Sequence, residues 1–362
     1  MTKQFPVIIL AAIVFALSGC MANSSKKEVV DEDLVYPRPP EDPRYYYERT
    51  INSSADVLSD TESDKLRRAF TGESLRGEGF AKPYGVAVHR GRIFVGDTVR
   101  HAVLVFDIPE QKFFFIGRDQ NEGEGKIHKP MGMSTDGSGN LYVLDATAKR
   151  VVVYDRDGNF LRNIGKPGDF YRPAGIGVDK EGTRVYAVDI GGSSSNNHHV
   201  LVYDAQTGER LENISERGTE DGQVNLPRDA LVAPDGSIYV IDGGNFRVQH
   251  FSSEGDYISK FGSVGRNPGQ FSRPKEGAVD NEGNVFVVDA AFGNFQIFNS
   301  DGQLLMHVGE RSNRNRPARF TLPSSLDVDE DGRVYVVDQL FRKIEVFRPA
   351  DLEEDEGFTF TE

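Results

Sequence analysis

Residues 172–189 read RPAGIGVDKEGTRVYAVD, and this stretch decides the fold. It holds two short runs of β-branched, aromatic and small residues, 175–179 and 184–189, on either side of the turn-forming pair Glu181 and Gly182. Such runs favour β-strands, and an acidic residue followed by glycine favours the turn between them. Two more runs follow at 200–204 and 210–215, so the unit is expected to form four short antiparallel strands.

The same pattern occurs six times along the chain. Each unit opens with a proline, at Pro83, Pro130, Pro173, Pro227, Pro274 and Pro323. Each second strand ends in an aspartate, at Asp97, Asp145, Asp189, Asp242, Asp289 and Asp338. A period of about 45 residues with four strands per unit is typical of a propeller, because one sheet cannot bury both of its faces unless sheets stack around a ring. The near absence of a 3.6-residue pattern excludes a helical solenoid. The chain is therefore predicted to be all-β, a six-bladed β-propeller with its blades at residues 80–348.

The two ends of the propeller domain, residues 44–350, are predicted to meet in the last blade. The sixth unit reaches a third strand at 344–347 and then runs into an acidic tail, 351–362, without a clear fourth strand. Residues 45–51, YYYERTI, match the fourth strands of other units, so we expect them to complete that blade and remove an exposed sheet edge. The string SDTE at 59–62 resembles a helix capping box and predicts a short helix at 61–70.

Three segments carry a family resemblance. RPAGIGVD at 172–179, NNHHVLVY at 196–203 and GNFRVQHF at 244–251 resemble NHL repeats, and the resemblance extends over residues 80–348. It implies the propeller fold. It implies little about function, because this fold carries RNA readers, protein-interaction sensors, lyases and lactone hydrolases.

The N-terminus resembles a bacterial lipoprotein signal. An apolar stretch at 5–17 follows Lys3, is too short to span a bilayer, and runs into LSGC ending at Cys20. The resemblance implies a signal peptide at 1–19, cleavage before Cys20, and acylation of Cys20 as the lipid anchor. Met21 after the cysteine implies the outer membrane by similarity to enterobacterial sorting, with the side of the membrane left open. Residues 20–43, rich in charge and then in proline, are predicted to form a solvated stalk.

Composition limits the function classes. Cys20 is the single cysteine, so the mature domain has no disulfide and no cysteine metal ligand. The net charge is −14, which argues against nonspecific nucleic-acid binding. We therefore expect no nucleic-acid partner.

Cations are predicted to gather on one face of the ring. The links entering each first strand and the turns between second and third strands should open on that face, which we call the link face. The turns between first and second strands, rich in acidic residues, should open on the opposite turn face. Acidic residues there are explained by the turns that they form, whereas cations around a concave mouth attract anions. The alternative is a solvated rim, where acids of the same links cancel the cations: Glu122, Glu124, Glu220 and Asp221. The candidate binding residues are Arg100, His101, Lys149, Arg228, Asp229, Arg247, Lys275, Glu276, Asp327 and Arg342.

Acidic residues also depart from the repeat near the axis. The second position after the proline is glycine in three units, at 85, 132 and 175, and then becomes Asp229, Glu276 and Ser325. Asp229, Glu276 and Asp327 are candidate ligands for Ca²⁺ or another hard cation, which could activate water for hydrolysis. Pairing of these acids with neighbouring Arg or Lys is the alternative. A zinc site from His101, His128 and His198 is not expected, and no nucleophile motif is present.

The sequence thus predicts a lipid-anchored envelope propeller that binds an envelope protein or an acidic glycan, with no cofactor and no catalysis. The alternative is a metal-dependent hydrolase or lyase that uses the axial carboxylates.

Overall fold

The structure is a computed structural model that describes residues 34–59, 66, 69–71, 77–118, 123–192, 196–353 and 356–358. All of them belong to one unit of the chain, Glu32–Glu362. The predicted signal peptide, Cys20 and most of the helix predicted at 61–70 lie outside the described residues, as does part of the acidic tail. In the described part, no helix is long and apolar enough to cross a membrane.

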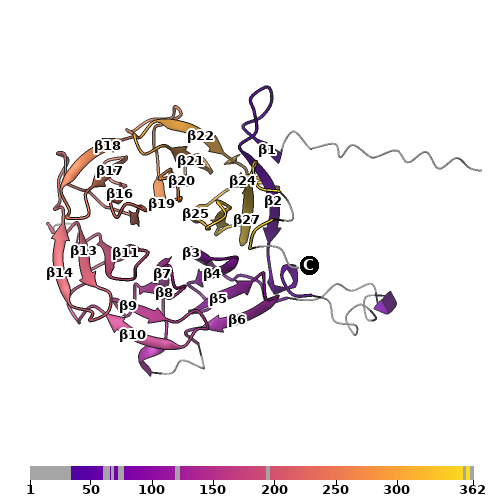
Figure 1. Ribbon diagram of the computed structural model, residues 1–362, viewed down its shortest axis with the longest axis horizontal. Coiled ribbons are helices and arrows are strands. Elements are labelled where there is room, and N and C mark those ends of the chain that lie inside the picture. The colour runs from indigo at the N-terminus through magenta and orange to yellow at the C-terminus, as the bar shows by residue number, and fades with distance from the viewer. Residues whose placement is uncertain are drawn as a thin grey trace, which may run out of the picture. The chain divides into compact units, whose positions relative to one another are not determined.

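Six antiparallel sheets form a ring in this unit, as Figure 1 shows. The first strand of each blade lies innermost and contacts the first strands of the two adjacent blades. Blade 1 consists of β3 Pro83–His89, β4 Arg92–Asp97, β5 Ala102–Asp107 and β6 Lys112–Ile116. Blade 2 consists of β7 Pro130–Thr135, β8 Leu141–Asp145, β9 Arg150–Tyr154 and β10 Phe160–Ile164. Blade 3 consists of β11 Pro173–Val178, β12 Arg184–Asp189, β13 His199–Asp204 and β14 Arg210–Ile214. The predicted six-bladed propeller is confirmed.

Blades 4 and 5 repeat the same order of strands. They consist of β15 Asp229–Val232, β16 Ile238–Asp242, β17 Arg247–Phe251 and β18 Tyr257–Phe261; and of β19 Pro274–Val279, β20 Val285–Asp289, β21 Asn294–Phe298 and β22 Leu304–Val308. A small parallel pair, β23 Glu310–Arg311 and β24 Arg319–Phe320, lies in the link to blade 6, and two short 3-10 helices are η2 Ser54–Asp56 and η3 Gly123–Gly125.

Blade 6 joins the two ends of the domain. It contains β25 Pro323–Val328, β26 Val334–Asp338 and β27 Lys343–Pro349, and its fourth strand is β2 Tyr45–Ile51. The register of β2 against β27 is antiparallel, running from Tyr45 opposite Pro349 to Ile51 opposite Ile344. The predicted closure by the N-terminal strand is confirmed, and ring closure removes a sheet edge that would otherwise be open.

The predicted stalk at 20–43 differs from the structure near its end. Val35 and Tyr36 form a short strand, β1 Val35–Tyr36, that pairs with β2 and is buried. The edge of Tyr36 packs against Phe347, with ring centroids 5.9 Å apart. The apolar run Leu34–Tyr36, between charged residues and prolines, is the sequence signal for this contact, because burying aromatic surface offsets the cost of ordering the chain.

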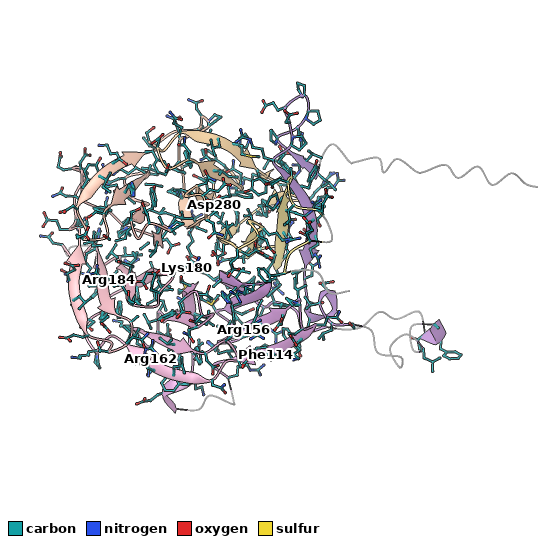
Figure 2. The ribbon with its side chains drawn as sticks, in the orientation of Figure 1. Phe114, Arg156, Arg162, Lys180, Arg184 and Asp280 are labelled. Carbon is teal, nitrogen blue, oxygen red and sulfur yellow. The ribbon has the colours of Figure 1, made fainter. Side chains whose placement is uncertain are left out.

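The core is divided among the spaces between blades. Six clusters of buried apolar residues each combine side chains from two adjacent sheets, and Figure 2 shows side chains filling these spaces. In the space between blades 2 and 3, for example, Tyr142 and Tyr203 are fully buried. Burial of a large apolar side chain contributes about 1.5–3 kcal/mol, so every blade depends on both neighbours.

Candidate functional site

The aspartate that ends each second strand organises the link face. Asp97 accepts hydrogen bonds from the backbone N–H groups of Ala81 and Lys82 in the preceding link, at 2.6 and 2.9 Å. Its other oxygen accepts from Val99 and Arg100 in the following turn, at 3.0 and 2.9 Å. All six repeat aspartates are buried. They fix the loops on this face and are structural residues.

Glycines let the inner strands approach closely at the axis. A Cβ atom on Gly175 would lie 2.3 Å from Asp229 Oδ1, and one on Gly85 would lie 2.2 Å from the Met131 carbonyl oxygen. In blades 1 and 3 the adjacent blade therefore leaves no room for a side chain at this position. Blades 4 to 6 carry larger polar residues there. Three blades present bare backbone to the axis, and the other three present side chains.

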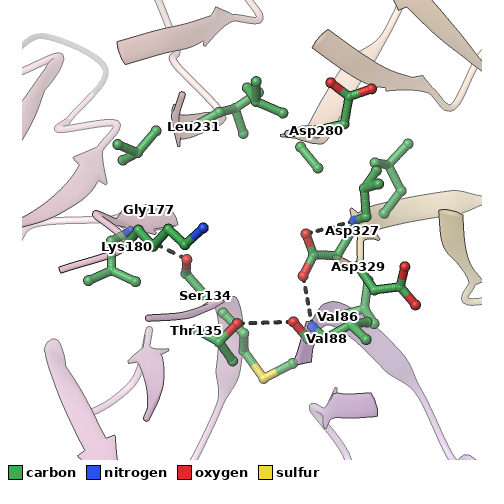
Figure 3. A pocket seen from close by; sticks show the side chains of 18 of the residues that line it. Val86, Val88, Ser134, Thr135, Gly177, Lys180, Leu231, Asp280, Asp327 and Asp329 are labelled. Atoms are coloured by element: carbon green, nitrogen blue, oxygen red, sulfur yellow. Dashed lines mark hydrogen bonds between the residues drawn. The ribbon is translucent and has the colours of Figure 1, made fainter. Parts of the chain in front are cut away.

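Two of the predicted axial carboxylates join neighbouring blades. Asp229 accepts from the N–H groups of Ala230 at 3.0 Å and Gly277, in the next blade, at 3.2 Å. Asp327 accepts from Val328 at 2.9 Å and from Val88, in blade 1, at 2.7 Å (Figure 3). Burial raises the pKa of Asp229 to about 8 and that of Asp327 to about 7. These oxygens are thus engaged by backbone donors.

Glu276 is the exception among the axial acids. Its side chain is buried, with 5% of the residue exposed, and its Oε1 has no hydrogen-bond partner among the described residues. Burial first, and then the nearby charge of Asp229, raise the pKa of Glu276 well above its usual value. Glu276 lines two cavities, one toward each face of the ring. Glu276 is thus a buried acid that lines both cavities, while its unpartnered Oε1 is shielded from solvent.

The cavity toward the turn face has a volume of about 200 Å³ and is shown in Figure 3. Its acids mostly shape turns: Asp136 accepts from the N–H groups of Ser138 and Asn140, both at 2.9 Å. Lys180 also lines it. Among the described residues, no group of three or more histidine or carboxylate side chains is placed to hold a metal ion.

A cavity of about 280 Å³ lies toward the link face. Its polar lining consists of Tyr84, Lys129, Tyr171, Arg172, Arg228, Lys275 and Glu276. Within the part of the chain that the structure describes, none of its four cations forms an ion pair. The lining of this cavity thus holds four cations and a single carboxyl group.

Arg228 and Lys275 lie one residue after the prolines of blades 4 and 5, on the inner wall of this cavity. Burial, followed by repulsion from Arg228 and Arg273, lowers the pKa of Lys275 to about 8. Burial also lowers the pKa of Arg228. Gly243 leaves room for Arg228, because a Cβ there would lie 2.7 Å from the arginine Cγ. Both cations lose hydration and have no side-chain hydrogen bond or ion pair among the described residues, so an anion entering the cavity would restore favourable interactions.

The other predicted binding residues have different surroundings. Lys149 is exposed at the rim, its Nζ 5.5 Å from the centre of the Tyr171 ring. Arg100 pairs with Glu78 at 3.0 Å. Arg342 and His101 are exposed at the positive-φ positions of equivalent turns.

Arg247, also predicted to bind a partner, is buried and has a structural role. Its Nε donates to Asp242 at 3.0 Å, and its Nη2 donates to the carbonyls of Glu220 and Gln223, both at 2.8 Å. The histidines do not converge either: His101 Nδ1 contacts the His128 carbonyl, and His198 Nδ1 accepts from Leu226 N–H at 3.1 Å.

Tyr84 and Tyr171 were not among the candidates from sequence. The signal for Tyr84 is positional, since the residue directly after each unit's proline lines the link-face cavity in blades 1 to 5. Strand alternation places the next residue on the axis. Comparison of the first residue after the proline in every unit identifies Tyr84, Arg228 and Lys275 as one group.

The fold and cavities define the class of protein: a six-bladed β-propeller with a cationic cavity toward its link face. Residues 134–216 match the model of the family DUF5128, described as a 6-bladed beta-propeller. Among solved structures, a Bacteroides thetaiotaomicron protein of unknown function is 17% identical with a TM-score of 0.60, covering 83% of this chain and 75% of that chain.

Two enzymes share the architecture at similar distance. A Xanthomonas campestris gluconolactonase is 15% identical with a TM-score of 0.57, covering 84% of this chain and 98% of its own. A Staphylococcus aureus virginiamycin B lyase is 11% identical with a TM-score of 0.52, covering 83% and 98%. At these identities the likeness concerns the fold alone.

Proposed function

We propose that this protein is a non-catalytic binding propeller of the bacterial envelope, anchored in lipid through Cys20, that holds an anionic group of an acidic glycan or envelope protein. The observation that carries the proposal is the link-face cavity, where Lys129, Arg172, Arg228 and Lys275 face a shared space without ion pairs among the described residues. Such a cluster attracts anions by its summed potential, and a partly desolvated wall makes each contact stronger than at an open surface.

Binding of polyanions to the full-length protein tests the proposal. Polygalacturonate and polyglutamate represent the glycan and the protein, with dextran as a neutral control, in calorimetric titrations at low and high salt. Replacing Arg228 and Lys275 together by Gln should weaken polyanion binding by about tenfold or more, since charge-assisted hydrogen bonds contribute about 1.5–3 kcal/mol each.

Lys180→Gln is the matched control, because Lys180 lines the opposite cavity (Figure 3). It removes one charge without altering the link face, and it should leave binding unchanged. The proposal fails if neither polyanion binds, or if Lys180→Gln weakens binding as much as the double variant.

The second candidate function is a metal-dependent hydrolase or lyase at the axis, favoured by the unpartnered Oε1 of Glu276. The residues present fit a cation poorly. Asp229 and Asp327 already accept backbone N–H groups from adjacent blades, and the described residues form no cluster with metal-ligand placement. Stoichiometric Ca²⁺ in elemental analysis of the purified protein, lost in Asp229→Ala with Glu276→Ala, would favour this candidate.

A further inference from the structure

The link-face cavity is a half-open hollow of about the size of one ligand unit. Its volume of about 280 Å³ lies just below the range of about 300–1,000 Å³ that is usual for small-molecule sites. It therefore suits a single ring or chain end better than an extended polymer segment. Tyr171, 56% exposed, lies at its edge together with Lys149, and Glu276 lies at its inner end, where the cavity meets the axis.

The cavity wall combines two kinds of polar groups. Arg228 and Lys275 supply donors and positive charge, which match a carboxylate. Glu276 adds a buried carboxyl group whose Oε1 lacks a partner among the described residues. A buried polar atom without a hydrogen bond costs about 1–3 kcal/mol, so a ligand that hydrogen-bonds this carboxyl group, once the group has turned toward the cavity, gains affinity.

The ligand group that bonds to Glu276 must be compatible with a carboxylate of the same ligand bound at Arg228 and Lys275. A second carboxylate near Glu276 would be repelled if Glu276 is ionised. A hydroxyl group can donate to an ionised carboxylate and can accept from a protonated carboxyl group, so it satisfies Oε1 in either state. A ligand with a carboxylate at one position and hydroxyl groups at others matches the whole wall.

We propose that the ligand of this cavity is a sugar acid, a uronate-type unit at the end of an acidic glycan. Its carboxylate contacts Arg228 and Lys275, and one of its hydroxyl groups bonds to Glu276. The inference rests on the proposed anion-binding function and narrows it from acidic polymers in general to hydroxyl-bearing carboxylates. An aspartate or glutamate side chain of a protein partner has the carboxylate and lacks the hydroxyl group.

Three small ligands test the inference on the full-length protein by calorimetry or ligand-observed NMR. Glucuronate carries both features, glutarate carries carboxylates without hydroxyl groups, and glucose carries hydroxyl groups without a carboxylate. Glucuronate should bind about tenfold or more tightly than either of the others, the ratio expected when a buried polar atom is left unpaired.

Two substitutions of Glu276 separate its role from that of the cations. Glu276→Gln keeps a donor and an acceptor and should retain the preference for glucuronate, whereas Glu276→Leu should reduce it to about twofold without weakening glutarate. Arg228→Gln should weaken both acids together. Thermal melting establishes that each variant is folded, and if the Leu variant is not, the ligand ratio on the unaltered protein decides.

The outcomes distinguish the two proposals. If glutarate binds as well as glucuronate and both require Arg228, the anion site stands and the sugar-acid inference is wrong. If glucose equals glucuronate, the inference is also wrong, because the carboxylate then contributes nothing. If none of the three ligands binds in an Arg228-dependent way and polygalacturonate and polyglutamate also fail, the cavity is not an anion site and both proposals fall.

Discussion

Replacing Arg333 by Met should destabilise the ring at its closure. Arg333 precedes β26 and is fully buried. Its Nε donates to Glu48 Oε2 at 2.8 Å, its Nη1 to Asp331 at 3.2 Å, and its Nη2 to the Glu356 carbonyl at 2.8 Å. Glu48 lies in β2, so one guanidinium connects the closing strand, the neighbouring turn and the C-terminal segment.

The expected loss follows from the charge left behind. Removing one partner of a buried ion pair costs about 3–5 kcal/mol, because the remaining charge loses its compensation. Arg49 Nη2 also donates to Glu48 Oε1, at 2.8 Å, and keeps part of that compensation. We therefore expect a loss of about 2–4 kcal/mol. With an unfolding entropy of about 2.1 cal/mol/K per residue over roughly 330 residues, Tm should fall by about 3–6 °C.

Urea unfolding followed by circular dichroism measures the change. Arg184→Met is the matched control: Arg184 occupies the corresponding place in blade 3, at the periphery in Figure 2, and donates to the Ser253 carbonyl at 2.9 Å. Arg184 also forms a side-chain hydrogen bond with Tyr186, so Arg184→Met should cost about 1–2 kcal/mol, the usual value of two hydrogen bonds. Adding Glu48→Gln to Arg333→Met should recover part of the loss. Equal losses in the two Arg variants, or no recovery in the double variant, would refute the reasoning.

Three further predictions concern closure, pH and the anchor. Deleting residues 36–52 removes β2 and should lower the melting temperature sharply in a thermal scan; an unchanged melt would contradict closure. Burial holds the pKa of Asp229 at about 8 and of Asp327 at about 7, so the folded protein binds more protons than the unfolded chain. The stability that these two groups contribute should therefore be fully present below about pH 4 and be lost as the pH rises through 7 to 8. Asp229→Asn should flatten the dependence of the urea midpoint on pH. Equal midpoints at pH 5 and pH 8 in the unaltered protein would count against this. Cys20→Ala should abolish labelling by a fatty-acid analogue and move the protein from membrane to soluble fractions; retention in the membrane would disprove the anchor.

The six-bladed ring could be predicted from the sequence because the residues that mark the ends of its strands act locally. Proline before each inner strand and aspartate after each second strand recur in six units, and each aspartate bonds to nearby backbone, as Asp97 does to residues 81, 82, 99 and 100. The sequence of the last unit also lacks a fourth strand, and this gap predicted the closure by residues 45–51. Local hydrogen bonds of this kind leave a repeated pattern in the chain.

The site was only partly predictable, because its chemistry depends on contacts between blades. Arg247 looked like a surface cation, yet backbone carbonyls from the link before its blade surround it. Asp229 and Glu276 stand at equivalent repeat positions, but the oxygens of Asp229 meet backbone donors and one oxygen of Glu276 does not. Side-chain partners across the ring have no fixed spacing in the sequence, so only coordinates distinguish these residues.

The pairing of β2 with β27 has a consequence for the order in which the protein matures. Tyr45 lies opposite Pro349, so β2 is synthesised about 300 residues before the strand with which it pairs. Contacts between such remote parts of a chain form slowly, because a long loop must close first. Until then the blades can stack on one another as an open arc, and the ring closes only once β27 has been synthesised.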